Sequence, residues 1–110
     1  MFSINGTSVS LTRGDSCYIR AEITGYTVKQ GDMLTLSIKV DTDPTSPYLV
    51  QKVVQDASVD TVFAFQPNDT KDMEYGTYKY DIQLDTVDGG RYTIIPPSNF
   101  VITEEVTYNG

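Results

Sequence analysis

The sequence contains no histidine and only one cysteine, and this limits the chemistry that its side chains can perform. Catalysis by a Ser-His-Asp or Cys-His arrangement needs an imidazole that accepts the proton of the nucleophile. A zinc site needs three or four ligands, mainly cysteine and histidine, and this chain supplies one. We therefore exclude these mechanisms and predict no catalytic residue, no cofactor and no metal ligand.

The single cysteine and the carboxylates have simpler interpretations than catalysis. Cys17 alternates with Ile19 and Ala21, so we predict that it is a small buried apolar residue. Paired carboxylates catalyse glycoside hydrolysis, but nothing in the sequence places two of them across a cleft, and tryptophan is absent. A solvated strand face explains the available acids equally well: Asp81, Asp85, Glu104 and Glu105.

Two short motifs are similar to known binding sequences. Asp41-Thr42-Asp43 has the acid spacing that opens an EF-hand loop, but Ser46 and Lys52 replace the glycine and the glutamate that the loop requires. Arg13-Gly14-Asp15 is a tripeptide that some adhesion receptors recognise, and its glycine and aspartate also suit a tight turn. We predict solvated turns at both places, and calcium shared between distant loops stays open for Asp69, Asp72 and Asp88.

Composition limits the classes of partner. Fifteen acidic and eight basic residues give a formal charge of -7, and the basic residues are scattered. Nucleic-acid binding needs a basic patch, because counterion release supplies most of the non-specific affinity. The apolar runs are far shorter than the ~20 residues that span a bilayer, and the first residues lack the regions of a signal peptide. We expect no nucleic-acid partner, no membrane insertion and no signal peptide.

Alternation of apolar and polar residues with period two recurs along the chain, and it predicts half-buried strands. The pattern is clearest over residues 17–23, 34–40 and 78–84. Less regular strands are expected at residues 8–12, 48–55, 59–65 and 91–95, with a continuation from Phe100. Residues 67–74 are expected to contain one helical turn, capped by Asn68 or Asp69.

These short strands, separated by glycine and aspartate turns, predict one domain over residues 1–110. The predicted fold is all-β, an immunoglobulin-like antiparallel β-sandwich of seven to eight strands, with a small β-barrel as the alternative. Residues 72–80 resemble the corner before the sixth strand of immunoglobulin-like domains, where a tyrosine hydroxyl bonds back to the preceding turn.

The eight tyrosines are a mild surplus for a chain of this size. Alternation places Tyr78 and Tyr80 in the core. Tyrosine is also enriched at protein interfaces, so five of the other tyrosines are candidates for a contact surface. These candidates are Tyr18, Tyr26, Tyr48, Tyr92 and Tyr108.

Three stretches together carry a resemblance to a known family: LTRGDS at residues 11–16, YGTYKYDIQL at 75–84 and TIIPPSNFVITEEVT at 93–107. The sequence resembles small proteins encoded in phages and prophages of Firmicutes. More distantly, it is similar to the N-terminal domain of the upper baseplate protein of lactococcal-type siphophages. In that family a β-rich domain docks onto the baseplate core, and a following region holds receptor-binding proteins. This sequence ends at Gly110, so we expect it to lack that arm.

The resemblance implies a non-enzymatic structural or accessory protein of a phage tail or baseplate. Such a protein acts through contacts with other phage structural proteins and with itself, is assembled in the bacterial host cytoplasm and resides in the virion. An acidic phage-encoded inhibitor of a basic host protein and a carbohydrate-binding accessory module are the alternatives.

The docking surface is expected at the last strand. We predict that residues 100–107 lie at a sheet edge, where acidic side chains discourage indiscriminate strand pairing. This edge and the nearby tyrosines form the candidate contact surface, which comprises Tyr18, Tyr26, Tyr92, Glu104, Glu105 and Tyr108.

Overall fold

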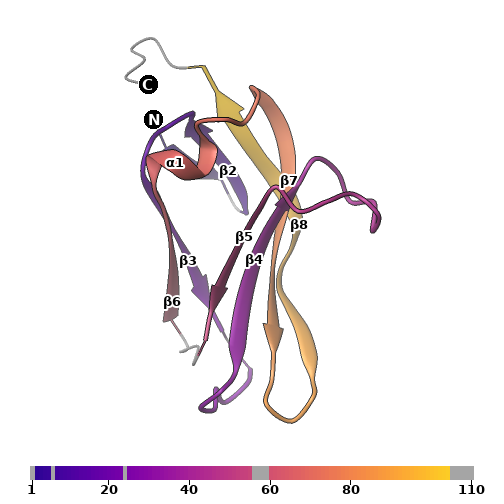
Figure 1. Cartoon of the computed structure of the whole chain (residues 1–110). Helices are drawn as coiled ribbons and strands as arrows, with labels where there is room; N and C mark the ends of the chain where they lie inside the picture. Colours follow the sequence, from indigo (N-terminus) through magenta and orange to yellow (C-terminus); the bar gives the residue numbers. More distant parts are fainter. Residues whose placement is uncertain (1, 6, 24, 56–59, 105–110) are drawn as a thin grey trace.

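The computed structural model describes residues 2–5, 7–23, 25–55 and 60–104. Within these residues the protein is mostly β, with eight strands and one short helix (Figure 1). The elements are β1 (Phe2–Asn5), β2 (Ser8–Thr12), β3 (Cys17–Glu22), β4 (Met33–Lys39), β5 (Val50–Val54), β6 (Asp60–Phe65), α1 (Pro67–Thr70), β7 (Gly76–Asp85) and β8 (Arg91–Thr103). The predicted β-rich character and the range of seven to eight strands are confirmed for the described residues, and β1 is a strand that the periodicity missed.

The strands form two sheets. One has six strands in the order β1-β2-β8-β7-β4-β5, and the other contains β3 and β6. All neighbouring strands are antiparallel except β2 and β8, so the prediction of purely antiparallel sheets is wrong. The parallel pair places Val9 beside Phe100 and Leu11 beside Ile102, and all four side chains are buried. Burial of these four side chains is the physical reason why β2 joins this sheet.

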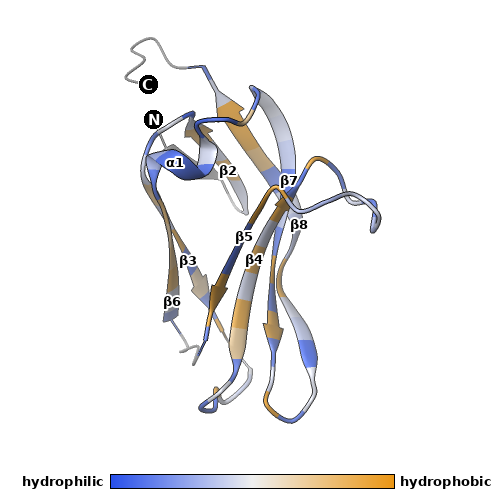
Figure 2. Cartoon of the chain, in the orientation of Figure 1, coloured by the Kyte–Doolittle hydropathy of each residue, from blue (hydrophilic) through white to orange (hydrophobic). Residues whose placement is uncertain are grey.

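The core lies between the two sheets. Along β3, β4, β6 and β7 every second side chain is buried, as the alternating colours of Figure 2 indicate. The largest fully buried side chains of the core include Ile19 and Phe63 from the small sheet and Leu36, Ile82 and Phe100 from the large one. Each such side chain contributes roughly 1.5–3 kcal/mol on burial. The other side chains of β4 and β7 form the outer face of the large sheet.

β8 differs from its prediction in two ways. It is one continuous strand, and its pairing with β7 shifts register between Ile95 and Ser98, where Pro96 and Pro97 interrupt the ladder. Its end, up to Thr103, lies between β2 and β7 and not at a sheet edge, so the predicted edge is wrong over the described residues. Residues 105–107 of that predicted strand lie outside the described residues.

The two ends of the molecule have different connections. At one end, residues 25–32 before β4 lie beside the hairpin of residues 86–90 between β7 and β8, and we call this the loop end (Figure 1). The opposite end contains α1 and the turn after β2. The predicted helical turn is present, but its cap is Gln66, whose backbone N–H donates to the Asp69 carboxylate at 2.7 Å. Neither Asn68 nor Asp69 is the cap, because both lie inside α1.

Candidate functional site

The structure scatters most of the predicted contact residues. Tyr18 lies on the outer face of β3 and is 65% exposed, whereas Glu104 is exposed just beyond β8 at the other end from the hairpin. Tyr26 and Tyr92 are the two that come together, with ring centroids 6.0 Å apart at the loop end. Glu105 and Tyr108 lie outside the described residues.

A buried carboxylate organises the loop end. Asp32 is fully buried, and its Oδ2 accepts hydrogen bonds from the Tyr26 hydroxyl at 2.9 Å and the Lys29 backbone N–H at 2.8 Å. Its Oδ1 accepts the backbone N–H of Val87 at 2.9 Å. A buried charge is tolerated only when such donors surround it. Asp32 therefore ties the connection before β4 to the hairpin between β7 and β8.

This network changes two pKa values. The backbone donors of Lys29 and Val87, with the Tyr26 hydroxyl, hold the pKa of Asp32 below its usual range, although burial acts in the opposite direction. Burial and the hydrogen bond to Asp32 raise the pKa of Tyr26 to about 12. Asp32 is therefore ionised and Tyr26 protonated at neutral pH, which keeps this hydrogen bond charge-assisted.

The β7–β8 hairpin presents apolar side chains beside this network. Gly90 N–H donates to the Thr86 hydroxyl at 2.8 Å, and Gly89 has a φ of 91°, which suits glycine in a tight turn. Val87 is 55% exposed and Tyr92 is 54% exposed. Together with Tyr26 they form an apolar patch on a pre-organised end of the molecule, and we call Tyr26, Val87 and Tyr92 the loop-end patch.

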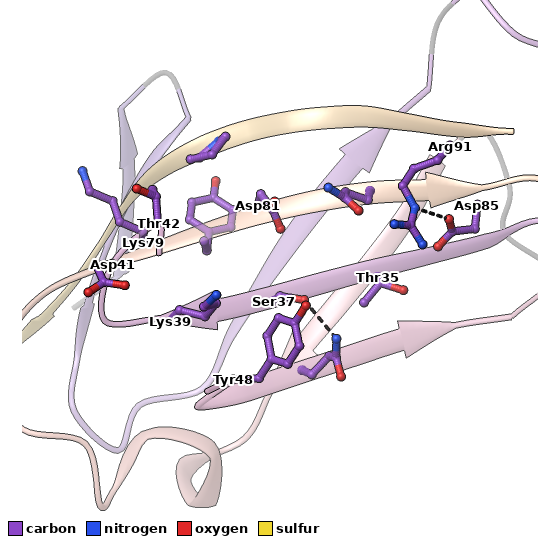
Figure 3. Close-up of a pocket in the computed structure, with 14 residues that line it drawn as sticks. Thr35, Ser37, Lys39, Asp41, Thr42, Tyr48, Lys79, Asp81, Asp85 and Arg91 are labelled. Carbon is purple, nitrogen blue, oxygen red and sulfur yellow. Dashed lines mark hydrogen bonds and ion pairs between the residues drawn. The ribbon is translucent and has the colours of Figure 1, made fainter. Parts of the chain in front are cut away.

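A second feature is a groove on the outer face of the large sheet. Its volume is about 270 Å³, and it is lined by side chains from β4, β5, β7, β8 and the β4–β5 connection (Figure 3). Asp81 projects from β7 near its middle, and the exposed ring of Tyr48 also lines the groove. The Asp85–Arg91 ion pair, with Nε to Oδ1 at 2.7 Å, closes one end, and Lys39 lies near the other.

The groove residues are mostly polar positions that alternate with the core residues of β4 and β7. Period two in the sequence put Ser37 and Asp81 on outer faces, but it did not show that they are directly opposite each other in the register. Tyr48 was a predicted contact residue, and Asp81 and Asp85 were interpreted as a solvated face. The sequence contained each residue of the groove but no indication that the residues converge.

The predicted interpretation of Cys17 is confirmed. The side chain is buried in the core. Burial raises the pKa of the Cys17 thiol to about 11, and nearby Asp69 adds to the rise while Lys52 opposes it. The thiol is therefore protonated at neutral pH and is a poor nucleophile.

The adhesion-like tripeptide is held against the protein. The Arg13 guanidinium lies 4.3 Å from the centroid of the Tyr75 ring, and the Gly14 N–H donates to the Thr70 hydroxyl at 3.0 Å. Gly14 has a φ of 82°, consistent with the predicted tight turn. The arginine that an adhesion receptor would bind thus packs against an aromatic ring of its own chain.

The loop carboxylates that could bind calcium accept hydrogen bonds within their own turns. Asp41 Oδ1 accepts hydrogen bonds from the Asp43 N–H at 3.0 Å and the Ser46 hydroxyl at 2.6 Å. Asp88 lies at the loop end, whereas Asp69 lies at the helix end, so calcium shared by distant loops would need to bridge opposite ends. Across the described residues, no three Asp, Glu or Cys side chains come together as a metal site requires.

No protein-family model, no curated protein and no solved structure matches the chain. Among the residues that the structure describes, there is no helix with the length and apolar character needed to cross a bilayer.

Proposed function

We propose that the chain is a non-enzymatic structural or accessory module of a phage tail or baseplate, which docks onto other virion proteins through its loop end. The loop-end patch is the observation that carries this proposal, since the buried charge of Asp32 holds the Tyr26 hydroxyl and the Val87 backbone, and the Tyr92 ring packs near Tyr26, before any partner arrives. Pre-organised aromatic side chains lose little conformational entropy on binding, and tyrosine is enriched among the residues that dominate interface energies.

The finer description of the fold is part of the same proposal. An immunoglobulin-like sandwich has two packed sheets, and the order β2-β8-β7-β4-β5 opposite β3-β6 is consistent with that plan. The Tyr78 hydroxyl donates to the Glu74 carbonyl at 2.6 Å, which is the bond expected of the corner before the sixth strand. In immunoglobulin variable domains the loops at one end of the sandwich carry the binding residues, and we assign the loop-end patch to that end.

The protein setting follows from the sequence resemblance. We infer assembly in the cytoplasm of the bacterial host and a place in the virion, with other phage structural proteins as partners. The formal charge of -7 favours a partner surface with a basic rim around an apolar centre.

Mass spectrometry of purified virions tests the setting, and a substitution tests the surface. Tyr92→Ser removes a ring of the loop-end patch, and we expect it to lower incorporation into particles about tenfold or more, as loss of an interface anchor does. Tyr18→Ser is the matched control, because Tyr18 is similarly exposed but lies on the small sheet. Absence of the chain from virions, or equal loss with both variants, would contradict the proposal.

A further inference from the structure

Asp81 is a carboxylate in the groove on the large sheet, and no hydrogen bond among the described residues ends on it. Its side chain is partly buried among polar residues of β4 and β7. Burial raises the pKa of Asp81, and Lys39 offsets this effect only in part. A partly desolvated carboxylate gains from a ligand that brings donors, because each charge-assisted hydrogen bond is stronger than a neutral one.

The cations of the groove already have partners. Arg91 is paired with Asp85, and Lys79 donates to the Asn99 side chain. Lys39 donates to the Asp43 carbonyl at 2.6 Å. An anionic ligand would therefore compete with existing bonds and approach Asp81 as well. A basic ligand would meet three cations in the same groove, so the charges favour a neutral ligand that carries hydroxyl donors.

The exposed aromatic ring of the groove is that of Tyr48, since Tyr80, which also lines it, is buried. Tyr48 is 60% exposed, and Lys39 Nζ lies 5.5 Å from its centroid. The centre of a protein interface is depleted in charged side chains, whereas this groove is lined by six of them. An exposed ring beside carboxylate and hydroxyl groups instead matches a ligand with one apolar face and many hydroxyl groups.

We propose that this groove binds a neutral saccharide, whose hydroxyl groups donate to Asp81 and whose ring packs against Tyr48. The groove is open, and its volume of about 270 Å³ is just below the range of roughly 300–1,000 Å³ for small-ligand sites. It therefore accommodates a short stretch of a longer chain. This site is separate from the loop-end patch and gives the module a second binding activity beyond virion assembly.

The experiment uses the purified full chain and a bacterial glycan array that carries neutral and anionic glycans. The strongest neutral glycan is then titrated into the ¹⁵N-labelled protein while amide shifts are followed by NMR. We expect retention of neutral glycans and shifts confined to β4, β7 and the segment around Tyr48. Retention of anionic glycans alone, of no glycan, or shifts elsewhere would overturn the proposal.

Two variants and one matched control locate the site. Asp81→Asn and Tyr48→Ala are each expected to weaken glycan binding about tenfold, the effect of losing a strong hydrogen bond or an aromatic contact. Tyr18→Ala removes a similarly exposed ring on the other sheet and should leave binding within about twofold. The dispersion of each variant's NMR spectrum verifies that it is folded.

Two further measurements exclude other occupants. Oligolysine is the probe for a basic peptide, and a dilution series without ligand is the probe for a second copy of the chain. Shifts of the amide signals of groove residues with oligolysine, or on raising the protein concentration alone, would assign the groove to that occupant. Either result would overturn the proposal of a saccharide ligand. Because these measurements use purified protein, their result is independent of whether the chain enters virions.

Discussion

A tyrosine hydroxyl stabilises each end of the molecule, but the two acceptors differ. At the loop end, Tyr26 donates to the buried carboxylate of Asp32, which also binds Val87 from a segment 55 residues away. At the helix end, Tyr78 donates to the carbonyl of Glu74, four residues earlier in the chain. The acceptor at the loop end is charged and is shared with a distant segment, whereas the acceptor at the helix end is neutral and serves a local bond. Two tyrosine bonds of similar length are therefore expected to differ in strength, in pH dependence and in how far the sequence predicts them.

The largest effect is expected from Asp32→Ala. The change leaves the Tyr26 hydroxyl and the N–H groups of Lys29 and Val87 without an acceptor in a buried place. We expect the melting temperature to fall by more than in any variant of the helix end, as measured by thermal denaturation followed by circular dichroism. Asp72→Ala at an exposed position is the control and should change it little. An equal change in both variants would show that the network does not hold the loop end.

A smaller effect is expected from Tyr78→Phe. The ring is retained in the core, and only the bond to the Glu74 carbonyl is lost. We expect the free energy of unfolding to fall by about 1 kcal/mol in urea denaturation, the usual contribution of one neutral hydrogen bond. A loss larger than that of Asp32→Ala would reverse the comparison between the two ends.

The smallest effect is a difference in pH dependence. Because the pKa of Asp32 is lowered in the folded protein, its carboxylate stabilises the fold above the unfolded pKa of about 3.9. This contribution is lost as pH falls through the folded pKa. The difference in unfolding free energy between the wild type and Asp32→Asn should therefore be constant from about pH 5 to pH 7 and decline below about pH 4.

Tyr78→Phe provides the control for this pH series, since its lost bond joins two neutral groups. Its difference from the wild type should stay constant over the same range in urea denaturation. If the difference in unfolding free energy declined equally in both variants below about pH 4, another carboxylate would be responsible for the loss of stability in acid.

Local features of the fold could be predicted from the sequence. Alternation placed β3, β4 and β7 and the burial of Cys17, because period two directly reports which side chains face a core, and β2 and β6 were expected as less regular strands. The corner at residues 72–80 was predictable since its hydrogen bond spans a single turn of chain. These features depend on neighbours in the sequence.

The other features depend on the order and register of the strands, which the local pattern of residues along one sequence does not reveal. The parallel placement of β2 beside β8 and the opposition of Ser37 and Asp81 arise from strand neighbours far apart in the chain. The acceptor role of Asp32 was hidden for the same reason, because its turn sequence predicts a loop and not a partner 55 residues away. The groove could not be predicted either, because its side chains converge only once the strand order is known, although most of them occupy ordinary outward-facing positions.

The two prolines of β8 have a consequence for behaviour at high concentration. Among the described residues, β2 pairs with only the last four positions of β8, so the segment before Phe100 has an open backbone edge. Pro96 and Pro97 have no N–H to offer there, and the register shift bends the strand beside them. A strand from another molecule therefore finds no N–H donor at these two positions, which disfavours extension of the sheet there. The longest strand of the protein is thereby protected against the edge-to-edge growth that starts fibrils.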